Sequence, residues 1–159
     1  MALFRILPWK ALVVLSYLLL ICLIVLNFYG LYSNRFYFFK FDNYILPLLA
    51  VVHFIYLFVI RFKIREMEYP DPQMRNLEYV LYIILSVYVF KAFDTLFTVL
   101  SYNDYDHHLI PETFLPIGIT IFILYLVLMY VTFSLFLFRK EHIGAYDFES
   151  LNEKIDPWP

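Results

Sequence analysis

The feature that most constrains this chain is a run of 25 residues, 114–138, that contains no charged side chain. A helix needs about 20 consecutive apolar residues to cross a bilayer, because each residue rises 1.5 Å and the hydrocarbon core is about 30 Å thick. A helix that is apolar on every side offers no polar face to water. The run therefore predicts a membrane span.

Three further apolar runs are long enough to span a bilayer. The first exceeds the apolar region of a signal peptide and lacks a small-residue cleavage pattern at its end, so we interpret it as an uncleaved span. The predicted fold class is an all-α integral membrane protein with four transmembrane helices and short loops, and residues 1–159 form a single membrane domain. The expected spans are 10–30, 44–62, 77–101 and 113–138, followed by a short cytoplasmic tail, 139–159.

Composition supports lipid as the solvent and excludes several classes of function. Apolar residues make up 63% of the chain and charged residues 16%, against roughly 45–50% and 25% in soluble proteins. The net charge of −2 gives no basic surface for nucleic acid. The single cysteine, Cys22, excludes an intramolecular disulfide and a cysteine-based metal site.

The distribution of Lys and Arg predicts the orientation, because positively charged loops are retained in the cytoplasm. With both termini inside, nine Lys and Arg residues fall in cytoplasmic segments, whereas the outer loops contain only Arg35 and Lys40. We therefore expect both termini on the cytoplasmic side. The expected location is a bacterial inner (plasma) membrane, with an organelle membrane as the alternative.

The first outer loop is crowded with Phe and Tyr residues, especially over 32–43. Aromatic rings with one polar edge settle at the level of the lipid headgroups. We interpret this segment as an aromatic belt in the outer interface, with a binding surface for a lipid tail or a partner as the alternative.

Two charged residues, Lys91 and Asp94, interrupt the third apolar run. A charge in the hydrocarbon costs about 2.5–3.5 kcal/mol, so both residues need a reason to be there. Residues three apart share a helix face and can pair directly. His53 and Lys91 each lie about ten residues below the outer ends of their helices, or roughly 15 Å deep. We expect His53, Lys91 and Asp94 to form one intramembrane polar cluster, with Tyr56 and Tyr88 extending its hydrogen bonds.

The outer loop between the third and fourth spans concentrates carboxylate and imidazole groups, which are ligands that zinc and similar ions use. Adjacent histidines on one loop seldom both bind one ion, so we expect a solvated loop and no bound metal. The residues that would ligate an ion here are Asp104, Asp106, His107 and His108.

No recurring catalytic or nucleotide-binding motif occurs in the sequence, so we expect neither an enzyme nor a cofactor. Haem between two spans would need a second axial ligand, and His53 is the only histidine in a span. Only three glycines are present, so close self-packing of the helices is not encoded in the usual way.

Our first hypothesis is a non-enzymatic structural or accessory subunit of a larger membrane complex, whose partners are lipids and other membrane subunits. The alternative is a small transporter or proton- or ion-conducting protein that uses His53, Lys91 and Asp94. A third possibility is a membrane-embedded enzyme built on the 104–112 loop.

Overall fold

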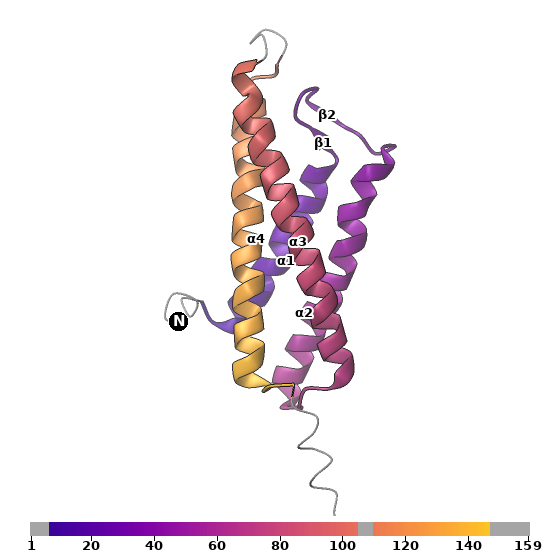
Figure 1. The fold of residues 1–159 in the computed structure, drawn as a ribbon, viewed down its shortest axis with the longest axis vertical. Helices are drawn as coiled ribbons and strands as arrows, with labels where there is room; N and C mark the ends of the chain where they lie inside the picture. Colours follow the sequence, from indigo (N-terminus) through magenta and orange to yellow (C-terminus); the bar gives the residue numbers. More distant parts are fainter. Residues whose placement is uncertain (1–6, 105–109, 147–159) are drawn as a thin grey trace, which may run out of the picture.

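The computed structural model describes residues 7–104 and 110–146 and shows an antiparallel bundle. The four long helices of this described part are each long and apolar enough to cross a membrane, as expected of a multi-pass membrane protein. Shorter elements cap the end of the bundle opposite to the start of α1 (Figure 1). The elements in chain order are α1 (Trp9–Asn27), β1 (Tyr29–Gly30), β2 (Arg35–Phe36), η2 (Phe41–Tyr44), α2 (Ile45–Glu66), α3 (Pro72–Leu100), η3 (Ser101–Asp104) and α4 (Phe114–His142).

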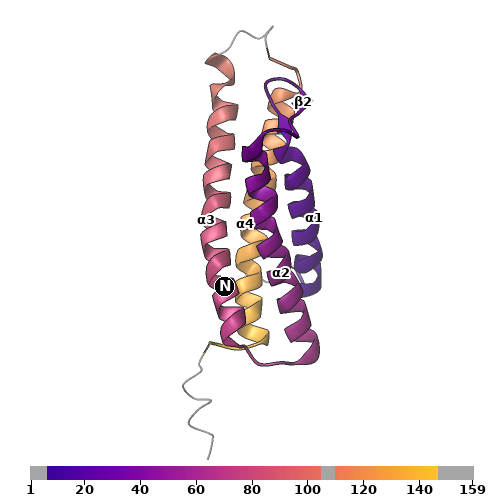
Figure 2. The same cartoon turned by 90° about the vertical axis from the view of Figure 1, so that its right-hand side faces the viewer.

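The helices run up, down, up and down, and each packs against the next one in the chain. Helices α1 and α4 also lie side by side and close the bundle, and α3 packs along α4 (Figures 1 and 2). The start of α1, the α2–α3 connection and the end of α4 consequently share one end of the bundle. We call this the terminal end, and we call the other, which carries β1 and β2, the hairpin end.

The helix bounds confirm the prediction of four long apolar helices but differ from the predicted spans at their ends. Helix α2 continues to Glu66, whereas the second expected span stopped at residue 62. Helix α3 begins at Pro72, before the expected start at 77, and α4 continues to His142. These extra turns are rich in polar residues. The helices continue through them because backbone hydrogen bonding does not require burial in hydrocarbon.

Local chemistry explains how the α2–α3 connection is made. Met67, which follows α2, adopts a left-handed backbone conformation with φ of 53°. Asp71 caps the start of α3, since its Oδ1 accepts a hydrogen bond of 2.6 Å from the Met74 backbone N–H. Pro72 occupies the first helical position, where a missing N–H costs little.

The interior of the bundle is apolar along most of its length, and α4 contributes most to it. Of the most apolar window of each helix, 44% of residues are buried in α4 but only 17% in α3. Helices α3 and α4 approach closely at Gly118, where an added Cβ would lie 2.7 Å from Val99 Cγ2. Helix α3 is thus the least buried of the four long helices.

The aromatic segment at the hairpin end folds back on itself. Strands β1 and β2 pair Tyr29 with Phe36 and Gly30 with Arg35. Phe39 and Phe41 are among the most exposed apolar side chains of the described residues. Their position at one end of the bundle fits the expected aromatic belt, which stays a prediction.

Candidate functional site

The predicted polar cluster lies between the middle of the bundle and its hairpin end. His53 on α2 is fully buried, and its Nδ1 lies 3.3 Å from the Tyr88 hydroxyl on α3. The two rings also stack, with centroids 5.9 Å apart. His53 Nε2 has no hydrogen-bond partner among the described residues. Of the two tyrosines expected to extend the cluster, Tyr88 contacts His53.

Lys91 and Asp94 line a small open cavity bordered by α1, α3 and α4. Its volume is about 130 Å³, and Tyr125 forms part of its wall. Lys91 is half-buried, whereas Asp94 is exposed and so lies at the cavity mouth. The expected direct ion pair between them is not among the ion pairs of the described part of the chain. The functional role of this cluster stays a prediction.

An aromatic contact connects the histidine to the cavity wall. The Tyr88 ring, which stacks on His53, lies 6.5 Å from the Tyr125 ring, centroid to centroid. Tyr125 in turn lines the cavity that contains Lys91 and Asp94. The three predicted site residues thus border one continuous set of side chains, although no hydrogen bond among the described residues joins His53 to either charged residue.

The candidate metal-binding loop lies partly outside the described residues. Asp104 ends η3, outside the helical bundle. Asp106, His107 and His108 lie outside the described residues. Within 7–104 and 110–146, no group of three or more His, Cys, Asp or Glu side chains is arranged to hold a metal ion.

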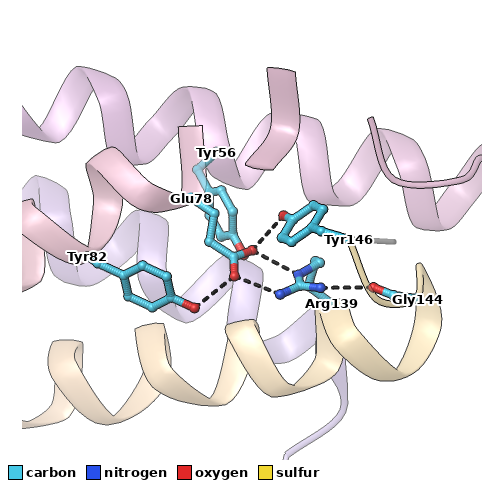
Figure 3. A network of polar contacts seen from close by, with 6 residues as sticks. All are labelled: Tyr56, Glu78, Tyr82, Arg139, Gly144 and Tyr146. Atoms are coloured by element: carbon cyan, nitrogen blue, oxygen red, sulfur yellow. Dashed lines mark hydrogen bonds and ion pairs between the residues drawn. The ribbon is translucent and has the colours of Figure 1, made fainter. Parts of the chain in front are cut away.

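A second polar group, at the terminal end, is centred on Glu78 of α3. Its side chain is 1% exposed and forms an ion pair with Arg139 of α4. Arg139 Nε donates to Glu78 Oε2 at 2.8 Å, and Arg139 Nη2 donates to Glu78 Oε1 at 2.7 Å. This bidentate geometry is the strong form of an arginine–carboxylate contact. Figure 3 shows the two side chains facing each other between their helices.

Three tyrosine hydroxyls complete the coordination of the Glu78 carboxylate (Figure 3). Tyr56 of α2 and Tyr146, which follows α4, donate to Oε2 at 3.1 and 2.8 Å. Tyr82 donates to Oε1 at 2.9 Å. A carboxylate offers about four lone-pair positions, so this one has no acceptor capacity left for a ligand. We call these five side chains the Glu78 network: Tyr56, Glu78, Tyr82, Arg139 and Tyr146.

The Glu78 network also fixes the segment that follows α4. Arg139 Nη1 donates to the Gly144 carbonyl oxygen at 2.8 Å, and its guanidinium lies 4.1 Å from the centre of the Tyr146 ring. Burial, together with the hydrogen bond to Glu78, raises the pKa of the Tyr146 hydroxyl well above its ordinary value. Tyr146 therefore stays a neutral donor at physiological pH. The network joins α2, α3 and α4 at one level.

Sequence reasoning missed the Glu78 network. In the sequence, Arg139 is one of the nine cationic residues expected in the cytoplasm. Glu78 lies near the start of the third apolar run, where a carboxylate is expected to face water. The spacing held a signal, since Met74, Glu78, Leu81 and Tyr88 lie on one face of α3 and are all buried. Tyr56, which was expected near His53, hydrogen-bonds to Glu78 instead.

A third charged group stabilises the α2–α3 connection. Lys63 Nζ lies 2.6 Å from Asp71 Oδ2 and 3.0 Å from Glu68 Oε2, and it donates to the Tyr69 carbonyl oxygen at 3.1 Å. Partial burial acts to raise the pKa of Asp71, but the hydrogen bonds from Lys63 and the Met74 N–H outweigh it and lower that pKa. The positive charge of Lys63 is thus balanced by the carboxylates of Asp71 and Glu68 within the connection.

Comparison with known proteins adds no functional information. No protein-family model matches the sequence, and no curated protein or solved structure matches the chain. The functional argument therefore depends on the geometry of this bundle.

Proposed function

We propose that this protein is a non-enzymatic accessory subunit of a larger membrane complex. The observation that carries the proposal is the outward surface of α3, the least buried of the four helices. An exposed carboxylate, Asp94, belongs to this surface. An ionised carboxylate facing lipid is unfavourable by about 2.5–3.5 kcal/mol, and a polar group on a partner helix would remove that cost.

Seven of the exposed side chains on α3 follow the spacing of a helix-packing seam. They recur at alternating intervals of four and three residues, which is the heptad pattern by which one helix packs against another. Five of them are large, apolar and more than 60% exposed: Ile83, Phe90, Phe93, Phe97 and Leu100. The seam as a whole consists of Tyr79, Ile83, Ser86, Phe90, Phe93, Phe97 and Leu100.

The partner proposed for this α3 seam is a membrane helix with a cationic or hydrogen-bond-donating side chain at the depth of Asp94. Aromatic side chains supply the contact area, and the carboxylate supplies orientation, since polar residues within membranes guide the association of helices. Lipids would cover the remaining apolar surface of the bundle. The buried Glu78 network supports a scaffold role, because it holds three helices at fixed positions.

A photoreactive phenylalanine analogue tests the α3 seam directly. We expect position 97 to crosslink to one membrane protein in native cells, whereas position 58 on α2 is the control because Phe58 is similarly exposed. Asp94→Ala is expected to reduce the crosslink at position 97 by about tenfold, equivalent to about 1.4 kcal/mol. A purified protein that stays monomeric in gentle detergent, with no crosslink at 97, would contradict the proposal.

We propose that both termini lie on the cytoplasmic side, because of the Lys and Arg distribution. The proposed location is a bacterial inner membrane, with an organelle membrane as the alternative. The structure is compatible with this orientation, since the start of α1 and the end of α4 share the terminal end. A tag placed after Trp158 should be inaccessible from outside intact cells. Labelling of that tag without permeabilisation would reverse the orientation.

The second candidate function, ion or proton transport, is favoured by the cavity that Lys91 and Asp94 line. The contacts of Tyr88 with His53 and with Tyr125 would supply titratable groups along a proton path to the cavity. For this function Asp94→Asn should lower proton flux into proteoliposomes by at least about tenfold, or 1.4 kcal/mol in the barrier. Equal flux in mutant and wild type, with unchanged helix content, would remove this candidate.

A further inference from the structure

A hollow at the terminal end, between the start of α1 and the end of α2, is separate from the Glu78 network and from the α3 seam. Its volume is about 570 Å³, within the range of about 300–1,000 Å³ that is usual for small-molecule sites. Three cationic side chains and three apolar ones line it: Lys10, Arg61, Arg65, Trp9, Val13 and Val14. We call it the basic hollow.

The charge of the basic hollow is largely uncompensated. Arg65 Nε lies 3.3 Å from Glu66 Oε1, and both of these side chains are exposed. Lys10 and Arg61 have no ion-pair partner among the described residues. The buried cations nearby behave differently, since Lys63 and Arg139 are each paired with carboxylates. Among the described residues, the hollow thus brings together three cations, of which only Arg65 has a carboxylate partner.

The helices add to this positive potential by their orientation. Helix α1 begins at the hollow, with Pro8 before it, no side-chain cap and no acidic residue in its first turn. The first N–H groups of a helix attract anions. Arg61 and Arg65 lie four residues apart on α2 and so share one face. Two antiparallel helices thus bring three cations and an uncapped helix start to the same end of the bundle.

The apolar part of the basic hollow has the position expected for a hydrocarbon chain. Val13 is buried and Val14 is exposed, one turn of α1 further into the bundle than Lys10. Trp9 lies beside Lys10, with the Lys10 ammonium 5.7 Å from the centre of its ring. Tryptophan prefers the boundary between headgroups and hydrocarbon. The cations lie toward the end of the bundle and the valines lie further into it. This order matches a molecule with an anionic head and an apolar tail.

We propose that the basic hollow binds an anionic phospholipid, with the phosphodiester against Lys10, Arg61 and Arg65 and an acyl chain along Val13 and Val14. Basic pockets between membrane helices on the cytoplasmic side hold such headgroups. This site is distinct from the protein partner proposed at the α3 seam, and either site can be present without the other.

Quenching of Trp9 fluorescence by brominated lipids tests this site in the full-length chain. For this experiment a Trp158→Phe variant is used, so that Trp9 is the remaining tryptophan. The variant is reconstituted in phosphatidylcholine vesicles that contain either brominated phosphatidylglycerol or brominated phosphatidylcholine. We expect stronger quenching by the brominated anionic lipid. Arg61→Gln should lower that preference by about fivefold, because it removes one of the three cations proposed to contact the phosphodiester.

Lys140→Gln is the matched control, since Lys140 is an exposed cation near the end of α4 that does not line the hollow. We expect it to leave the preference unchanged and Arg61→Lys to retain most of it. Equal quenching by both lipids would overturn the site. An equal loss in Arg61→Gln and Lys140→Gln would overturn it too, because it would indicate general surface attraction. Relief of quenching by excess inorganic phosphate would identify a free anion, not a lipid, as the ligand.

Discussion

Arg139→Ala is expected to lower the free energy of unfolding by about 3–5 kcal/mol, because it leaves the buried Glu78 carboxylate without its cation. The Glu78 side chain is 1% exposed and the Arg139 side chain 8%. The substitution also removes the hydrogen bond to the Gly144 carbonyl oxygen. Titration with a denaturing detergent in mixed micelles, followed by circular dichroism, measures the change.

Lys140→Ala is the control for this experiment, since Lys140 neighbours Arg139 in sequence but is exposed. It should change the free energy of unfolding by less than about 0.5 kcal/mol. The double substitution Glu78→Leu with Arg139→Met is expected to cost less than Arg139→Ala alone, because no charge then remains buried. A single Arg139→Ala variant as stable as Lys140→Ala would show that the Glu78 network does not hold the bundle together.

Asp71→Ala is expected to lower the free energy of unfolding by about 2 kcal/mol. Loss of the cap on α3 costs about 1 kcal/mol, and loss of the Lys63 ion pair, screened because the Asp71 side chain is 40% exposed, costs about as much. Asp71→Asn separates the two effects, since asparagine still caps the helix but cannot pair with Lys63. Equal stability of Asp71→Asn and Asp71→Ala would show that capping contributes little.

The Asp71 contribution also predicts a pH dependence. Its pKa is lower in the folded protein than its ordinary value of 3.8. The stabilisation is therefore complete above the unfolded-state value and is lost as pH falls through the lower, folded-state value. Between neutral pH and acid, wild type should lose more stability than Asp71→Asn. Parallel pH profiles for the two proteins would contradict this assignment.

Hydropathy along the chain was sufficient to predict the helices. The charge-free run 114–138 lies within α4, and the run 77–101, which Lys91 and Asp94 interrupt, lies within α3 except for its last residue. Each residue contributes to the transfer into hydrocarbon largely independently of its tertiary neighbours. Helix ends were less predictable, because the last turns depend on caps such as Asp71 and on contacts beyond the apolar run.

The polar sites likewise divide into residues that the sequence predicted and residues that it did not. Lys91 and Asp94 could be found from sequence, since two charges interrupt a long apolar run. Glu78 was missed, because a carboxylate at the start of a span can face either water or the interior, and only its spacing with the buried residues of α3 favoured the interior.

Sequence alone determined that this chain forms long apolar helices, because that outcome follows from the transfer of each side chain and its backbone out of water. Only the tertiary structure decided which polar groups meet. Arg139 reaches Glu78 since α3 and α4 pack together, and Lys10 joins Arg61 at the basic hollow since α1 and α2 are antiparallel neighbours. Such contacts depend on the rotation and depth of whole helices, which many residues set together.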